Sequence, residues 1–313
     1  YERMCRVREP YLRRGREAAA LTIPSTLPPY QSDGSASAAN RNQDQPEPHQ
    51  SIGSRAVNSL SSRLALTLFP VNPKFVRMTA PEHTLEGIDQ EVEGGRTDIE
   101  LELSAIEDQL LDKIEGLGLR PKIAPALEQL VITGNTLLNI PAKMKPRVWK
   151  LDSYVVERDP RDNLITVITR EGVNPVTLPD KVRAKLESKK IDLGSGPEEV
   201  VEVYTVVTRK DEKTFCEWQE IDGKVVDKVD EYSAAELPWL PLRMYPGDGE
   251  AYGRGHVERN LGDLRSIDVL SRALEHGGAM AAEVRWMVDT NHSSNPRVSD
   301  LQKSKNGEFI QGN

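Results

Sequence analysis

The rest of the chain is organised around one stretch, Gly253–Val288, which reads GRGHVERNLGDLRSIDVLSRALEHGGAMAAEVRWMV. It belongs to the longest proline-free run in the second half of the sequence, which lies between Pro246 and Pro296. A continuous α-helix over these residues would be about 50 Å long, which is long for a globular protein. We therefore predict one long helix near the end of the chain.

On a helical wheel, eight polar side chains of this stretch share an arc of about 100°. They are Arg254, Glu258, Arg265, Asp268, Arg272, Glu275, His276 and Glu283. Apolar side chains fill the wide remainder, which predicts neighbours on both flanks of the helix. Two interpretations follow. The helix is either buried in a monomeric enzyme with a solvated charged edge, or one member of a ring of helices whose charged strip lines a channel.

Composition bounds the class of protein. The chain has 313 residues, of which 37% are hydrophobic, enough for one or two domains with a core. Its formal net charge of −8 argues against a protein that grips nucleic-acid phosphates tightly, but not against one past which DNA slides. The two cysteines, Cys5 and Cys216, make neither a disulfide framework nor a cysteine zinc site, so we expect assembly in the cytoplasm.

Targeting signals are not apparent in the sequence. No apolar run reaches the length of a membrane span, and no signal peptide opens the chain, so we expect no membrane partner. Tyr1 is not a natural start residue, and we expect that the front of the chain is trimmed.

Apolar periodicity predicts helices first and a small sheet next. The predicted helices are residues 1–21, 53–69, 97–116 (opened by a capping box at Thr97) and a helix from Pro121 to Gly134. The predicted strands are 137–140, 148–156, 164–169, 200–208, 215–221 and 225–229. A further apolar extended piece at 237–244 is confined by its prolines to a sheet edge or to the entry position of a strand. Turns are expected at 159–163 and at Asp222-Gly223, a short helix at 180–186, and a mobile linker without core residues at 25–51. The predicted fold class is α+β.

A glycine-rich loop, residues 247–255, precedes the long helix. Phosphates bind where such loops lead into helix N-termini. The loop lacks the Walker lysine and the dinucleotide spacing, and Asp248 and Glu250 would repel an anion. We therefore prefer a glycine hinge that turns the chain into the helix, and keep phosphate binding as the alternative.

The sequence contains no recognisable catalytic or metal-binding motif. The five histidines are scattered, no nucleophile elbow surrounds a serine, and neither cysteine has a histidine nearby in sequence. We predict no catalytic residue, no metal ligand and no cofactor, and hence a protein that is not an enzyme.

An ordered series of segments along the chain resembles a known family. The segments are YERMCRVREPYLRRGREAAALTIPSTLPP, SIGSRAVNSLSSRLALTLFPVNPKFVRM, LEQLVITGNTLLNIP, KLDSYVVERDPRDNLITVITRE, VEVYTVVTR, LPWLPLRMYPGDGEAYGRGHVERNLGDLRSIDVLS and NPRVSDLQKSKNGEFIQGN. In this order they resemble the portal (head-to-tail connector) proteins of short-tailed, podovirus-type bacteriophages. The sixth segment, LPWLPLRMYPGDGEAYGRGHVERNLGDLRSIDVLS, is the most specific piece of the series.

The resemblance implies a portal-type α+β subunit. Residues 1–254 would form an α/β wing with its small sheet at about 136–245, residues 255–288 a stem helix, and residues 289–313 part of a clip. The rest of the clip, a second stem helix and a crown would be absent from this chain. Twelve such subunits would form a ring at one capsid vertex.

The family also implies partners and a location. The dodecamer would be the channel for packaging and ejecting double-stranded DNA, which passes without sequence-specific binding. Further partners would be the tail adaptor, the packaging ATPase (terminase), and the capsid and scaffolding proteins. The protein would reside in the virion after assembly in the host cytoplasm, and ATP would be hydrolysed by the separate motor.

The combined argument assigns two sets of candidate residues. The shared arc places seven side chains at the channel or between subunits: Arg254, Glu258, Arg265, Asp268, Arg272, Glu275 and Glu283. Position in the clip-like segment places Arg297, Lys303 and Lys305 at the adaptor or motor surface.

Two rival classes remain open at this point. One is a monomeric α+β enzyme that uses the glycine loop and an acidic cleft for a phosphorylated ligand. The other is a tail-adaptor or capsid scaffold protein, which would not need so long a wing. Oligomer size and nucleotide binding distinguish them.

Overall fold

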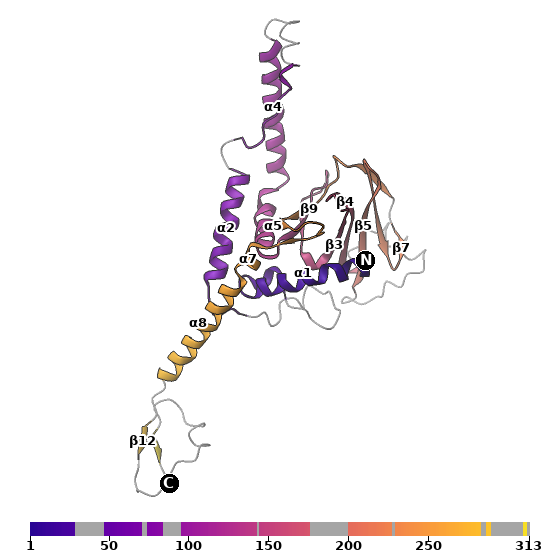
Figure 1. The fold of residues 1–313 in the computed structure, drawn as a ribbon. Coiled ribbons are helices and arrows are strands. Elements are labelled where there is room, and N and C mark those ends of the chain that lie inside the picture. Colours follow the sequence, from indigo (N-terminus) through magenta and orange to yellow (C-terminus); the bar gives the residue numbers. More distant parts are fainter. Residues whose placement is uncertain are drawn as a thin grey trace. The chain divides into compact units, whose positions relative to one another are not determined.

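The computed structural model describes residues 1–28, 47–70, 74–83, 95–142, 144–175, 200–226, 229–282, 286–288 and 309–311. The chain forms two compact units, Tyr1–Leu261 and Gly262–Asn313, and each is described by itself. In its described residues the first unit combines helices with two larger antiparallel sheets and one two-stranded antiparallel sheet (Figure 1). The predicted mixed α+β class is therefore confirmed.

Among the described residues, the first unit begins with four long helices, and all four were predicted. They are α1 (Glu2–Ala20), α2 (Ile52–Leu68), α4 (Gly95–Gly116) and α5 (Arg120–Thr133), with a 3-10 turn η1 at Pro24–Thr26. α4 begins two residues before the expected capping box at Thr97. α5 ends as predicted at Gly134, which adopts the left-handed conformation with φ 76°. Within the described chain, no helix has both the length and the apolar character needed to cross a membrane.

The prediction that residues 25–51 carry no core residue is wrong at both ends of that range. Leu27 is only 2% exposed, and Gln50 is also buried. The Gln50 side chain donates a hydrogen bond to the Leu21 carbonyl (2.7 Å) and accepts one from the Gly53 N–H (2.8 Å). The sequence did not reveal these contacts, because one buried leucine and one buried glutamine do not change the polar composition of residues 25–51. Most of the predicted linker, and all of the helix predicted at 180–186, lies outside the described residues.

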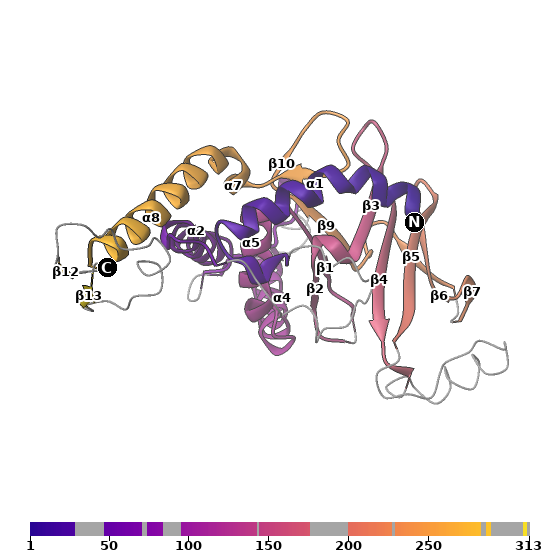
Figure 2. The ribbon, with the colours of Figure 1, turned by 90° about the horizontal axis from the view of Figure 1, so that it is seen from below.

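Helix α5 is the centre of the helical part. Its apolar side joins a core cluster made by Leu119, Ile123, Leu127 and Leu138, on which Leu64, Ala65, Phe69 and Ile114 pack, among others. α2 thus packs one side against this cluster, whereas α4 contributes Ile114, near its C-terminal end. α1 crosses from these helices to the strands of the larger sheet (Figure 2).

The smaller sheet has the strand order β2-β1-β9, with every pair antiparallel. Its strands are β1 (Asn135–Asn139), β2 (Arg147–Trp149) and β9 (Trp239–Arg243). β9 lies at the edge of this sheet, as its prolines predicted. The sheet follows directly on α5, so that Leu138 joins the core cluster of the helices, while Leu137, which points to the opposite face of the strand, is also buried.

The larger sheet is an antiparallel meander, β3-β4-β5-β6-β7, with β8 also paired to β6. Its strands are β3 (Tyr154–Arg158), β4 (Leu164–Val173), β5 (Val201–Asp211), β6 (Thr214–Ile221), β7 (Lys224–Val225) and β8 (Asp230–Ser233). The turn at Asp222-Gly223 is confirmed, with positive φ at both residues. The strand predicted at 225–229 is shorter than expected, because β7 ends at Val225.

The prediction of one strand over residues 148–156 is wrong. A 3-10 turn, η3 (Leu151–Ser153), separates β2 from β3, and these two strands belong to different sheets. The buried Arg8 Nη1 donates hydrogen bonds to the carbonyls of Leu151 (3.1 Å), Asp152 (2.9 Å) and Tyr154 (2.6 Å). These carbonyls face a helix far away in sequence, so a strand pattern read locally could not reveal the break.

The prediction of one continuous helix over residues 255–288 is also wrong. After the short strands β10 (Tyr245–Pro246) and β11 (Gly253–Arg254), the chain forms α7 (His256–Arg259) and then α8 (Leu261–Ala282). Asn260 separates the two helices: its N–H donates to the Val257 carbonyl (3.0 Å) in a tight turn, and its side chain donates to the His256 carbonyl (3.2 Å). Residues Trp286–Val288 form strand β12, which pairs in parallel with β13 (Phe309–Gln311).

Candidate functional site

The structure divides the predicted polar strip between the two units. Arg254 lies in β11 and Glu258 in α7, both in the first unit, while Arg265, Asp268, Arg272 and Glu275 lie on α8. The interruption at Asn260 means that the two sets do not follow one helical wheel. Glu283, Arg297, Lys303 and Lys305 lie outside the described residues.

Arg254 and Glu258 take part in a cluster of charges that joins the loop before α7 to α1. The Arg254 guanidinium is 3.0 Å from Glu250 Oε1 and 4.0 Å from Glu258 Oε1. Glu258 in turn lies 3.3 Å from Arg14 Nε, on α1. These two predicted residues therefore have partners within their own subunit, and they hold the start of α7 against the first helix.

The charges of this cluster predict that the first unit loses stability in acid. The hydrogen bond from Arg254 lowers the pKa of the Glu250 carboxyl, although slight burial opposes the shift. A carboxyl whose pKa is lower in the folded chain stabilises the fold above its unfolded pKa of about 4.3, and that stability is lost as the pH falls through the folded value. We expect the melting temperature of the wild type to fall more steeply between pH 5 and pH 3 than that of Glu250→Gln. Thermal unfolding followed by circular dichroism checks this.

Asp248→Asn is the matched control, because Asp248 is an exposed carboxyl in the same loop. It should leave the steep acid limb of the wild type in place. Parallel acid limbs for the wild type and Glu250→Gln would show that the Glu250–Arg254 pair does not stabilise the junction.

The glycines of the loop are explained by close packing of backbones. A Cβ on Gly255 would lie 2.1 Å from the Ile132 carbonyl oxygen, and one on Gly253 would lie 3.0 Å from the Gly134 carbonyl oxygen. The Asn135 side chain accepts a hydrogen bond from the Gly253 N–H (2.7 Å) and donates one to the Gly253 carbonyl (2.8 Å). The loop is thus fastened to the end of α5. This arrangement supports the glycine-hinge interpretation over phosphate binding.

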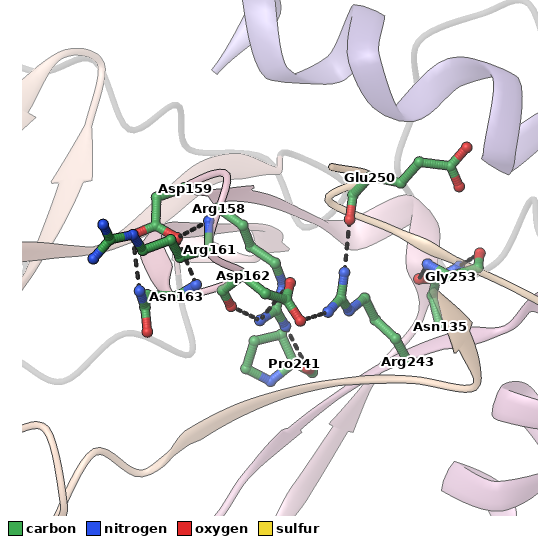
Figure 3. A network of polar contacts seen from close by, with 10 residues as sticks. All are labelled: Asn135, Arg158, Asp159, Arg161, Asp162, Asn163, Pro241, Arg243, Glu250 and Gly253. Atoms are coloured by element: carbon green, nitrogen blue, oxygen red, sulfur yellow. Dashed lines mark hydrogen bonds and ion pairs between the residues drawn. The ribbon is translucent and has the colours of Figure 1, made fainter. Parts of the chain in front are cut away.

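A second network fixes the loop to both sheets (Figure 3). Arg243, in β9, donates to the Glu250 carbonyl oxygen (2.6 Å) and forms an ion pair with Asp162 in the β3–β4 turn. Arg158, in β3, donates to the Pro241 carbonyl (2.8 Å). Asp159 closes the turn by accepting from the backbone N–H groups of Arg161 (2.9 Å) and Asn163 (2.7 Å), among others.

Sequence reasoning missed Arg158 and Arg243. Arg243 and Asp162 are 81 residues apart, and arginines are common on strand surfaces, so no local signal marks the pair. The Asp159–Asn163 turn was predicted, but its role in holding β9 was not. Together the two networks make the segment that enters α7 a rigid part of the first unit.

Helix α8 exposes an apolar surface. Val269, Leu270, Leu274 and Met280 are between 63% and 76% exposed. A Cβ added to Gly277 or Gly278 would meet no described atom within 4 Å, so these two glycines leave a low stretch on the helix surface. Large exposed apolar side chains on one helix mark a surface that another protein covers. Among the described residues there is no group of three or more histidine, cysteine or acidic side chains placed to hold a metal ion.

The comparison with known families decides among the open interpretations. The sequence model of the family described as bacteriophage head to tail connecting protein matches residues 1–313. This chain belongs to that family. The resemblance drawn from the ordered segments is therefore confirmed, and the glycine loop and α8 are elements of a head-to-tail connecting protein.

The individual relatives are named portal proteins. The chain is 32% identical over 323 residues to the portal protein of Escherichia phage T7, and 32% identical over 322 residues to that of Enterobacteria phage T3. It is 27% identical over 314 residues to the portal protein of Enterobacteria phage SP6. Each alignment covers 100% of this chain but only 57% to 58% of the relative. The chain thus spans a little more than half the length of the curated relatives it matches.

Proposed function

We propose that this chain is a subunit of a dodecameric portal ring at one vertex of a phage capsid. The ring would be the channel through which double-stranded DNA is packaged and ejected, and the attachment site for the tail adaptor. Membership of the head-to-tail connecting family supports this role, and so do the relatives named portal proteins. In this role the chain is structural rather than enzymatic, and it resides in the virion after assembly in the host cytoplasm.

The exposed apolar surface of α8 is the observation that carries the proposal. An isolated helix with four large apolar side chains in water would lose stability and associate. Copies of α8 arranged around a ring would cover this surface on both flanks. In this assignment the first unit is the wing, α8 is the stem helix, and residues 289–313 belong to the clip.

The polar side of α8 fits a channel through which DNA passes without being bound tightly. Arg265, Asp268, Arg272 and Glu275 fall within an arc of about 80° on the helix and carry two charges of each sign. Each arginine or lysine that grips a phosphate adds affinity, so a mixed strip lets DNA slide. We place these four residues, with Glu283, at the channel or between adjacent stem helices. Arg254 and Glu258 belong to the first unit, and we place them at the channel or between subunits as well, in addition to their partners within their own subunit.

The native mass of the full-length protein tests the proposal. Mass photometry with negative-stain images of the same sample should show rings of about twelve subunits with a central hole. A monodisperse monomer of the full-length protein would contradict it. The packaging ATPase, the adaptor, and the capsid and scaffolding proteins would then have no ring to bind.

Reversing two charges on α8 tests the channel assignment. In phage that depend on the variant, Arg265→Glu with Arg272→Glu should lower the yield of DNA-filled heads by about tenfold or more, because both changes make the strip uniformly acidic and repel phosphates or neighbouring subunits. Filled heads are counted by electron microscopy. The matched control is Lys122→Glu with Lys145→Glu, two exposed lysines of the first unit. If the α8 variant packages DNA and assembles like the wild type, the placement of these residues at the channel or between subunits is wrong.

We place Arg297, Lys303 and Lys305 at the surface that meets the adaptor or the motor, on the ground of their position in the clip segment. Their triple replacement by alanine should leave the ring mass unchanged and weaken adaptor binding in a pull-down. Unchanged adaptor binding would count against this placement.

A further inference from the structure

Helix α2 has an uncovered face opposite its buried one. Leu64 packs into the core cluster around α5. On the other side Arg55, Ser59, Ser62 and Leu66 are all exposed, and Leu66 is 62% exposed. Their spacing of four, three and four residues places them along one ridge of the helix. The side chains in the middle of the ridge protrude little from the helix, because both are serines.

Helix α4 has an uncovered face of a different kind. Its ridge, at spacings of four, three, four and three residues, consists of exposed side chains: Asp98, Glu102, Ala105, Gln109 and Asp112. Leu101 and Ile106, which flank this ridge, are 64% and 47% exposed. This ridge also has a small residue in its middle. The uncovered face of α4 therefore presents apolar side chains next to carboxylates to any helix that packs on it.

Another side of α4 is covered by its own chain. Lys74 Nζ lies 2.7 Å from Asp108, and the Met78 N–H donates to Glu107 Oε1 (2.7 Å). The apolar residues of α4 are only partly covered, because Ile106 stays exposed while Ile114 packs on the core cluster. The segment 74–83 therefore leaves the acidic ridge open.

The two helices have opposite charge. α2 contains Arg55, on its ridge, and Arg63, beside it, and no acidic residue, whereas α4 contains seven acidic and two basic residues. In the described part of the chain, these two arginines form no ion pair, and neither do the ridge carboxylates of α4. Small residues at the middle of both ridges allow two helix backbones to approach closely. Charge and shape therefore match along two helices that are each about four turns long or longer.

The two ridges do not cover each other within one subunit. α2, through one side, and α4, through Ile114 near its C-terminal end, contact the same core cluster, and the two helices follow one another along one edge of the unit (Figure 1). A ring requires the opposite arrangement: two different surfaces of one subunit, each fitting the other on the next copy. We propose that the α2 ridge of one subunit packs against the α4 ridge of its neighbour. This inference rests on the proposed ring and names a contact within its wing.

Charge reversal followed by charge exchange tests the contact in the full-length protein. Arg55→Glu with Arg63→Glu places like charges opposite each other, and the fraction of subunits in rings should fall by about tenfold at a fixed concentration. Adding Glu102→Arg and Asp112→Arg to the same chain should restore rings, because it exchanges the two signs. Mass photometry measures the ring fraction, and thermal unfolding confirms that each variant is folded.

The control carries the same change of charge elsewhere. Arg161→Glu with Lys213→Glu alters two exposed side chains in turns of the larger sheet and should leave the ring fraction unchanged. Rings of wild-type yield in the α2 variant would overturn the contact while leaving the proposed function intact. Loss of rings without restoration by the α4 changes would show that α2 meets a surface other than α4. Absence of rings in the wild type would reject the proposed function and this contact with it.

Discussion

Replacing Gly134 by alanine is expected to lower the free energy of unfolding by more than about 4 kcal/mol, a size seen only for a few severe mechanisms. Gly134 has φ 76°, and a Cβ there would lie 2.1 Å from the Arg254 carbonyl carbon and 2.4 Å from the Gly255 nitrogen. Both obstacles are backbone atoms, so no side-chain rotation relieves the overlap. The chain entering α7 would have to move away from α5.

Gly118→Ala separates this steric effect from the cost of left-handed backbone alone. Gly118 has φ 66°, but a Cβ there would meet no described atom within 4 Å. We expect it to cost only about 1–2 kcal/mol. Urea denaturation of both variants, followed by circular dichroism, measures the difference. Similar losses for the two glycines would show that the loop does not press on the end of α5.

The second large effect is expected for Arg8→Met, at about 3–5 kcal/mol of unfolding free energy. Arg8 is buried, and its Nη1 group serves three backbone carbonyls at the break between β2 and β3. Methionine fills similar space but donates no hydrogen bond, so buried carbonyls would be left without this partner. The packing of α1 against β3 should loosen, which near-ultraviolet circular dichroism would report.

Arg6→Met is the matched control for Arg8→Met, because Arg6 is exposed on the same helix. It should change stability by no more than about 0.5 kcal/mol. Arg8→Lys should fall between the two variants, since lysine keeps the charge and some of the donors but not the planar fork. Equal stability of Arg8→Met and Arg6→Met would mean that the strand break does not depend on Arg8.

Local patterns predicted most of the helical part and several turns. The periodicity of residues 53–69 and the glycine after α5 located two helices to within a residue or two. The Asp222-Gly223 turn and the edge position of β9 followed from the backbone preferences of glycine and proline. These features were predictable because their causes lie within a few residues in sequence.

The candidate site was predicted less completely. The wheel placed Arg265, Asp268, Arg272 and Glu275 on one arc of α8, and that arrangement follows from helical geometry alone. It wrongly continued the helix through Asn260, and so added Arg254 and Glu258 to the same strip. Those two side chains instead bind Glu250 and Arg14, and contacts of this kind depend on how α1 folds back.

The amino-acid sequence alone determined the family, the α+β class, the helices with strong periodicity and the tight turns, because each depends on short-range preferences or on an ordered series of segments. Tertiary structure decided where the long helix and the long strand are interrupted, and which arginines hold the two sheets together. Arg8 acts across 143 residues on Leu151, and Arg243 acts across 81 residues on Asp162. Hydrogen bonds over such separations form only after the chain has folded, so no local pattern encodes them.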